Sequence, residues 1–184
     1  MDKSQYKNVY VFVEQRDGVV QNVALELLGK ARELADALHE QVIALLLGKG
    51  VKDKADELIA AGADVVLSIE ADELAQYTTE PYAQAITQVI HERKPSILLI
   101  GATSIGRDLG PRLSARIGTG LTADCTGLDI SEDGDLLMTR PAFGGNLMAT
   151  IICKEHRPQM STVRPGVMPV SYTHLRAHET EADL

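Results

Sequence analysis

The chain has 184 residues, of which 18 are lysine or arginine and 26 are aspartate or glutamate, so its formal net charge is −8 at pH 7. The length suits one α/β domain, the acidic balance argues against a nucleic-acid partner, and no apolar run reaches the roughly 18 residues of a membrane span. Cys125 and Cys153 lack the spacing of a zinc site or a secreted disulfide scaffold, and we therefore expect a soluble cytoplasmic protein.

The first 102 residues alternate between strand patterns and helix patterns. Residues 8–14 are β-branched and aromatic, and Asp17-Gly18 after them is typical of a turn. Apolar residues recur at intervals of three and four from Asn22 to His39, which predicts an amphipathic helix capped by Asn22. Further strands are predicted over 41–48, 63–70 and 96–102, and further helices over 52–62 and 81–93. Continuous apolar strands separated by helices indicate an α/β fold with a doubly wound, mostly parallel sheet.

The pattern changes after Gly120. Short extended segments, divided by glycine, aspartate and proline, predict antiparallel strands appended to the parallel sheet. These segments cover residues 124–131, 134–142, 146–155 and 157–165. Residues 169–184 shift to histidine, glutamate and threonine, and we expect a non-native or disordered tail there, after one domain over residues 1–168.

The loop GATSIG, residues 101–106, follows a predicted strand and precedes a predicted helix. Ligands of open α/β sheets bind at the carboxyl ends of strands, and the amides of such a loop can face an anion. The loop matches neither GxGxxG nor GxxxxGK[ST], so a tight strand-to-helix turn is the competing interpretation. Pro111 predicts that the helix begins near 106–108, because a proline deep inside a helix removes a hydrogen bond.

Several polar residues near predicted strand ends are candidates for binding. The positive charge of Arg107 lies near the N-terminus of the predicted helix, where the helix dipole disfavours it. This position favours an acidic partner or a phosphate close to Arg107. Thr122 and Asp124 lead into an extended segment, where Asp124 either accepts a hydrogen bond from a cofactor hydroxyl or caps a local turn. Arg140 lies in TRPAFGGN, residues 139–146, and with Arg107 and Arg164 it suggests an anion-binding or flavin-facing cluster.

The same segment carries Phe143 and Asn146 on either side of a Gly-Gly pair, which fits either a plain β-hairpin loop or a loop that reaches a cofactor or a subunit. The sequence shows no GxSxG elbow, no HExxH and no defensible Cys/His arrangement. We therefore predict no catalytic residue and no metal site, and we do not expect a stand-alone hydrolase.

Three stretches together resemble the α subunit of electron transfer flavoprotein: VYVFVEQRDG (9–18), GATSIGRDLGPRLSARIGTGLTADCTGLDI (101–130) and LLMTRPAFGGNLMATIICKEHRPQMSTVRPGVM (136–168). The resemblance implies the N-terminal α/β domain of that subunit, Rossmann-like or adenine-nucleotide-hydrolase-like in fold. In the family a C-terminal domain holds FAD; its signatures are expected after Met168 and are not found in the tail.

The resemblance also implies a partner, the electron transfer flavoprotein β subunit, which holds AMP or, in bifurcating members, a second FAD. The complex passes electrons through FAD between acceptors and an acyl-CoA dehydrogenase of fatty acid β-oxidation or another flavin dehydrogenase. The loops around the six candidates are then expected to line the subunit interface or to approach the nucleotide of the β subunit. Two alternatives stay open: a domain that binds AMP or ATP by itself, and a pure dimerisation scaffold.

Overall fold

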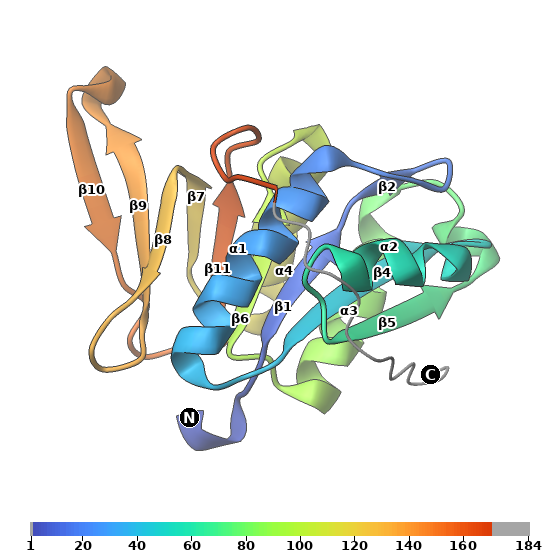
Figure 1. Ribbon diagram of the computed structural model, residues 1–184, viewed down its shortest axis with the longest axis horizontal. Coiled ribbons are helices and arrows are strands. Elements are labelled where there is room, and N and C mark those ends of the chain that lie inside the picture. Colours follow the sequence, from blue (N-terminus) through green and yellow to red (C-terminus); the bar gives the residue numbers. More distant parts are fainter. Residues whose placement is uncertain (1, 171–184) are drawn as a thin grey trace.

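The computed structural model describes residues 2–170, and its centre is a parallel sheet of six strands in the order β5-β4-β1-β6-β11-β7 (Figure 1). The strands are β1 (Val9–Val13), β4 (Val42–Gly48), β5 (Val65–Glu70), β6 (Ile97–Gly101), β7 (Leu121–Cys125) and β11 (Gln159–Val163). All of their pairings are parallel, so the predicted doubly wound sheet is confirmed.

Helices cover both faces of this sheet, and each face has its own apolar core. Val11 of β1 packs with α1 (Asn22–Leu38) and α2 (Ala55–Ala60), whereas its neighbour Phe12 packs with α3 (Thr79–Arg93) and α4 (Ser104–Ile117). Successive side chains of a strand point to opposite faces, which explains why both are buried. Three short 3-10 helices belong to this part of the described chain, η1 (Lys3–Gln5), η2 (Lys52–Lys54) and η3 (Asp72–Leu74), and a fourth, η4 (Phe143–Gly145), lies in the small sheet described below.

Two helix starts differ from the sequence prediction. Asn22 is the first residue of α1 and not its cap, and its side-chain amide donates to Glu26 Oε1 at 2.8 Å. Helix α4 begins at Ser104, earlier than Pro111 suggested, because the Thr103 hydroxyl caps it by accepting from the Gly106 N–H at 3.1 Å. Pro111 therefore lies inside the helix.

The extended segments after Gly120 divide between two sheets. Strands β8 (Gly127–Ile130), β9 (Leu136–Ala142) and β10 (Leu147–Ile151) form the predicted antiparallel sheet, in the order β10-β9-β8. The prediction was wrong for residues 159–163, since β11 runs parallel between β6 and β7 and is buried throughout. Gln159, Ser161 and Thr162 are polar but buried, so the hydropathy pattern did not indicate a strand inside the parallel sheet.

A small hairpin follows β1 at the carboxyl edge of the sheet. Strands β2 (Gln15–Arg16) and β3 (Val19–Val20) pair antiparallel around Asp17 and Gly18, both with positive φ. The Asp-Gly turn signal is thus confirmed. The prediction for the tail lies outside the described residues except for Pro169 and Val170.

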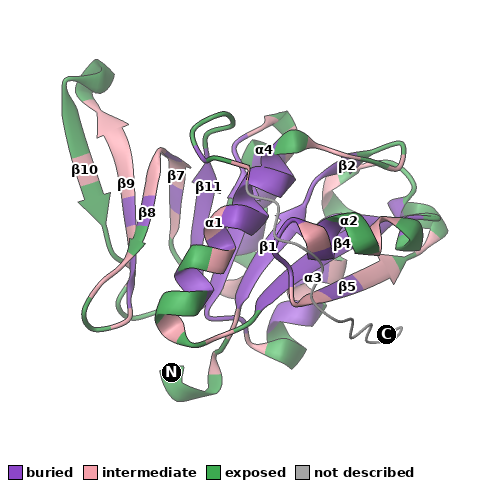
Figure 2. Ribbon diagram, in the orientation of Figure 1, coloured by how far each residue is buried: buried purple, intermediate pink, exposed green. Residues whose placement is uncertain are grey.

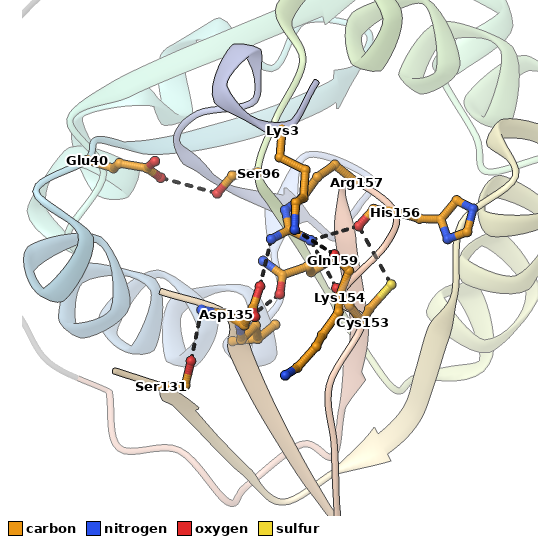
Figure 3. A network of polar contacts seen from close by, with 11 residues as sticks. Lys3, Glu40, Ser96, Ser131, Asp135, Cys153, Lys154, His156, Arg157 and Gln159 are labelled. Carbon is orange, nitrogen blue, oxygen red and sulfur yellow. Dashed lines mark hydrogen bonds and ion pairs between the residues drawn. The ribbon is translucent and has the colours of Figure 1, made fainter. Parts of the chain in front are cut away.

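A buried network of polar side chains joins the six-stranded sheet to the three-stranded sheet (Figure 3). Arg157 and Asp135 are each 9% exposed, and Arg157 Nη2 lies 2.8 Å from Asp135 Oδ1. Arg157 Nη1 also donates to the carbonyls of Cys153 and His156, both at 2.9 Å. Beside it, Gln159 Oε1 accepts from the Leu136 N–H at 2.8 Å. Strand β9 and the residue before it are therefore linked to β11 and the residues before it by side-chain contacts that the pattern of extended segments did not predict.

At the amino edge of the sheet, half-buried Glu40 gives a testable pH dependence. Its Oε2 accepts from the Asn8 N–H at 2.8 Å and from Ser96 Oγ at 3.2 Å, but burial outweighs these bonds and raises the pKa of Glu40 above 4.5. A raised pKa means that stability is fully present below the unfolded-state pKa and is lost as pH rises through the folded-state value.

We expect Glu40→Gln to remove this loss. The free energy of unfolding of the variant minus that of the unchanged chain should be larger at pH 7 than at pH 4.5, as measured by urea unfolding at both values. Glu57→Gln, at an exposed position of α2, is the control. If the difference in free energy of unfolding between the variant and the unchanged chain is the same at both pH values, the effect assigned to the raised pKa of Glu40 is contradicted.

Candidate functional site: the carboxyl edge of the sheet

A cationic cluster lies where β6, β7 and β11 end. Arg164 directly follows β11 and binds Asp124 of β7 with two nitrogens, Nε to Oδ1 at 3.2 Å and Nη2 to Oδ2 at 2.6 Å. These bonds hold the pKa of Asp124 below its usual range, although burial opposes them, and the charges of Arg140 and Arg107 add smaller effects in the same direction as the bonds. One guanidinium group thus binds the carboxylate and two others act on it from further away, so positive charges outnumber the negative charge of Asp124 in this group of four residues.

The backbone around Asp124 fixes the carboxylate in place. Asp124 has φ +58°, its N–H donates to Thr162 Oγ1 at 2.9 Å, and the Arg164 N–H donates to the carbonyl of Cys125 at 2.9 Å. Aspartate tolerates the left-handed region better than most residues, so its role here combines a special backbone position with an ion pair. Within this chain the Asp124 carboxylate pairs with Arg164, 40 positions away in the sequence, so the side chain makes a long-range ion pair and not the predicted local cap.

The structure brings only some of the six predicted residues together. Arg107, in the first turn of α4, and Arg140, in β9, both act electrostatically on Asp124. Thr122 is buried at 6% exposure beneath this surface. Phe143 and Asn146 lie in the turn between β9 and β10, exposed and at the outer end of the molecule (Figure 1).

Strand β10 and the turn before it are largely exposed to solvent, as the green ribbon in Figure 2 shows. Phe143 is 81% exposed, Leu147 59% and Met148 58%. Contiguous exposed apolar residues of this kind are typical of surfaces that bind another macromolecule. Arg140 is opposite Ala149 and therefore shares a face of the hairpin with Leu147, whereas Met148 lies on the other face. We call the first face, with the cationic cluster and the exposed turn, the hairpin surface: Arg107, Asp124, Arg140, Arg164, Phe143 and Leu147.

The topological switch point of the sheet, between β1 and β6, is filled by the chain itself. Glu14, 2% exposed, follows β1; Thr103 Oγ1 donates to its Oε2 at 2.5 Å, and Arg16 donates to its Oε1 at 2.9 Å. A Cβ at Gly101 would lie 2.8 Å from Val23 Cγ2, so the end of β6 is closely covered. Sequence analysis missed Glu14, although a carboxylate directly after a buried strand was the signal available.

Within residues 2–170, no group of three or more histidine, cysteine, aspartate or glutamate side chains could hold a metal ion. None of the helices described there is long and apolar enough to cross a membrane. Cys125 and Cys153 are both free thiols, the first buried and the second half-buried.

Comparisons with known proteins identify the family. The model described as Electron transfer flavoprotein domain matches residues 9–183. The chain is 58% identical over 168 residues to electron transfer flavoprotein subunit alpha of Clostridium acetobutylicum, covering 91% of this chain and 50% of that protein. The same subunit of Thermoanaerobacterium thermosaccharolyticum is 58% identical over 165 residues, covering 90% and 50%.

A relative with another printed name is also similar. The acryloyl-CoA reductase electron transfer subunit beta of Anaerotignum propionicum is 48% identical over 190 residues, covering 91% of this chain and 52% of that protein. The chain spans about half the length of the curated relatives it matches. These matches and the parallel sheet agree with the motifs around residues 101–130 and 136–168, and the chain belongs to the electron transfer flavoprotein family.

Proposed function

We propose that this chain is the N-terminal part of an electron transfer flavoprotein α subunit that carries electrons between dehydrogenases and acceptors as a heterodimer with a β subunit. The observation that supports the proposal is the hairpin surface, where apolar side chains stand beside three arginines at the carboxyl edge of the sheet. An apolar patch suits a protein partner, and clustered guanidinium groups suit an anionic group that the partner holds.

FAD is the cofactor that the family implies. Two places on this chain, the switch point and the hairpin surface, differ in whether their residues fit such an anionic group. At the switch point the buried carboxylate of Glu14 stands where a phosphate would have to lie, so that place does not fit a dinucleotide. The hairpin surface does fit an anionic group, since Arg107 and Arg140 direct positive charge toward Asp124. Bound flavin would supply the electron-transfer chemistry, and this chain would supply positive charge from outside the flavin pocket.

The partners follow from the same proposal. We infer that the β subunit holds AMP or a second FAD, and that the electron donor is an acyl-CoA dehydrogenase or another flavin dehydrogenase. The printed name of the Anaerotignum propionicum relative joins electron transfer to a reductase of a CoA ester, which is an electron acceptor, and so supports an oxidoreductase of CoA esters as a partner. Arg107, Asp124 and Arg140 then approach the nucleotide, while Phe143 and Asn146 contact the subunit.

Flavin absorbance after purification tests the partner requirement. We expect the chain expressed alone to be colourless and the chain co-expressed with a cognate β subunit to give a yellow complex. Calorimetry with AMP and with ATP on the chain alone should show no binding, because Glu14 repels phosphate at the switch point. Flavin or adenine nucleotide held by the chain alone would instead support the stand-alone nucleotide-binding alternative.

Arg140→Ala tests the electrostatic role. Positive charge stabilises a reduced, anionic flavin, so its removal should lower the two-electron reduction potential of the complex by about 30 mV, equivalent to a tenfold change in equilibrium constant. Arg112→Ala is the matched control, since Arg112 lies on α4 but pairs with Glu80. An unchanged potential with normal assembly would favour the scaffold alternative.

A further inference from the structure

Strand β10 is the outermost strand of the small sheet and pairs only with β9 among the described strands (Figure 1). Its sequence from Leu147 to Ile152 is LMATII, without a charge or a proline. Strands at the edge of a sheet usually carry charged residues, prolines or bulges that prevent pairing with other chains. This edge lacks charges and prolines, which makes it competent to pair with an added strand.

The hydrogen-bonding direction of β10 follows from its neighbours. The Thr126 N–H donates to the carbonyl of Thr139 at 2.9 Å, so the peptide groups of Thr139 point toward β8. Successive residues in a strand direct these groups to opposite sides, so Arg140 directs its own toward β10, where it is opposite Ala149. Met148 and Thr150 therefore direct their N–H and C=O groups to the open edge.

The side chains of the same strand indicate what kind of structure covers it. Met148 projects from one face of the sheet, whereas Leu147 and Ile151 project from the other, and they are 58%, 59% and 39% exposed. A helix lying on one face would leave the other face and the free peptide groups exposed. A strand added to the edge satisfies the peptide groups and extends both faces at once.

We propose that the open edge of β10 pairs with an extended strand of the electron transfer flavoprotein β subunit, so that one sheet continues across the two subunits. The inference rests on the proposed function. A second copy of this chain is a poorer occupant, because it would bring another cluster of three arginines to the interface, whereas a different chain can supply carboxylates or a bound phosphate.

Thr150→Pro tests the edge, with Thr150→Val as its matched control. Both variants lose the 3.0 Å contact between the Thr150 and Thr139 hydroxyls, but only proline removes the outward N–H and places a ring at the edge. A proline whose missing N–H faces solvent is tolerated in an edge strand. We expect proline to weaken binding of the β subunit at least about tenfold and valine to change it less than about threefold.

Amide hydrogen exchange of the unchanged chain gives a readout that needs no variant. The Ala149 and Ile151 amides, which face β9, should be protected in the free chain and in the complex. The Met148 and Thr150 amides should exchange fast in the free chain and slowly in the complex. Fast exchange of both in the complex would overturn the pairing.

The remaining outcomes separate this inference from the proposed function. If Thr150→Pro binds the β subunit as Thr150→Val does, edge pairing is wrong while the heterodimer stands. If the unchanged chain does not bind a cognate β subunit, the proposed function fails and this inference fails with it. If the chain alone is a dimer and the proline variant a monomer, a second copy occupies the edge and the assignment to the β subunit is overturned.

Discussion

Asp135→Ala is expected to lower the free energy of unfolding by about 3–5 kcal/mol, the usual cost of leaving one charge of a buried ion pair without its partner. Arg157 would keep its bonds to the carbonyls of Cys153 and His156 but would lose the Asp135 carboxylate at 2.8 Å. Urea unfolding should show a lower midpoint with an unchanged slope.

Two further variants test whether the loss in Asp135→Ala comes from leaving the charge of Arg157 unpaired. Asp129→Ala, at the exposed position of β8, should change stability by less than about 0.5 kcal/mol. Adding Arg157→Met to Asp135→Ala should recover part of the loss, because no unpaired charge then remains buried. A double variant that is less stable than Asp135→Ala alone would show that Arg157 acts mainly through its carbonyl contacts.

Gly106→Ala is expected to destabilise the chain by about 3 kcal/mol or more, even though alanine favours a helix by about 1 kcal/mol over glycine. A Cβ at Gly106 would lie 1.7 Å from the carbonyl oxygen of Gly101, so backbone of either β6 or α4 would have to move. The first turn of α4 carries Arg107, and its displacement should also weaken binding of the β subunit.

Gly110→Ala is the control in the same helix. There the new Cβ would meet the side chains of Thr162 at 3.1 Å and Leu121 at 3.4 Å, which can adjust. We expect its effect on the thermal unfolding midpoint to be much smaller than that of Gly106→Ala. Equal effects of the two substitutions would mean that the close approach at Gly101 is not what requires glycine.

Periodicity in the sequence was sufficient for the strands and helices up to residue 102, because strands buried on both faces are continuously apolar and the covering helices are amphipathic. The glycines, aspartates and prolines after Gly120 also predicted antiparallel strands, and a β-hairpin was one of the two interpretations of the Gly-Gly pair that β9 and β10 flank. It failed at β11, where Gln159, Ser161 and Thr162 are buried and the polar groups of Gln159 and Thr162 bond to Leu136 and Asp124. A hydropathy pattern carries no information on hydrogen-bond partners that come from other strands.

The sequence by itself determined the fold class, the family motifs and the presence of arginines near strand ends. Only the tertiary structure decided that Arg107, Arg140 and Arg164 act on one carboxylate, that Arg157 is buried against Asp135, and that Glu14 fills the switch point. The physical reason is the range of the interactions: helix and strand patterns arise from neighbours along the chain. Ion pairs and buried hydrogen bonds instead join residues 22 to 89 positions apart, which only the packing of the sheets brings together.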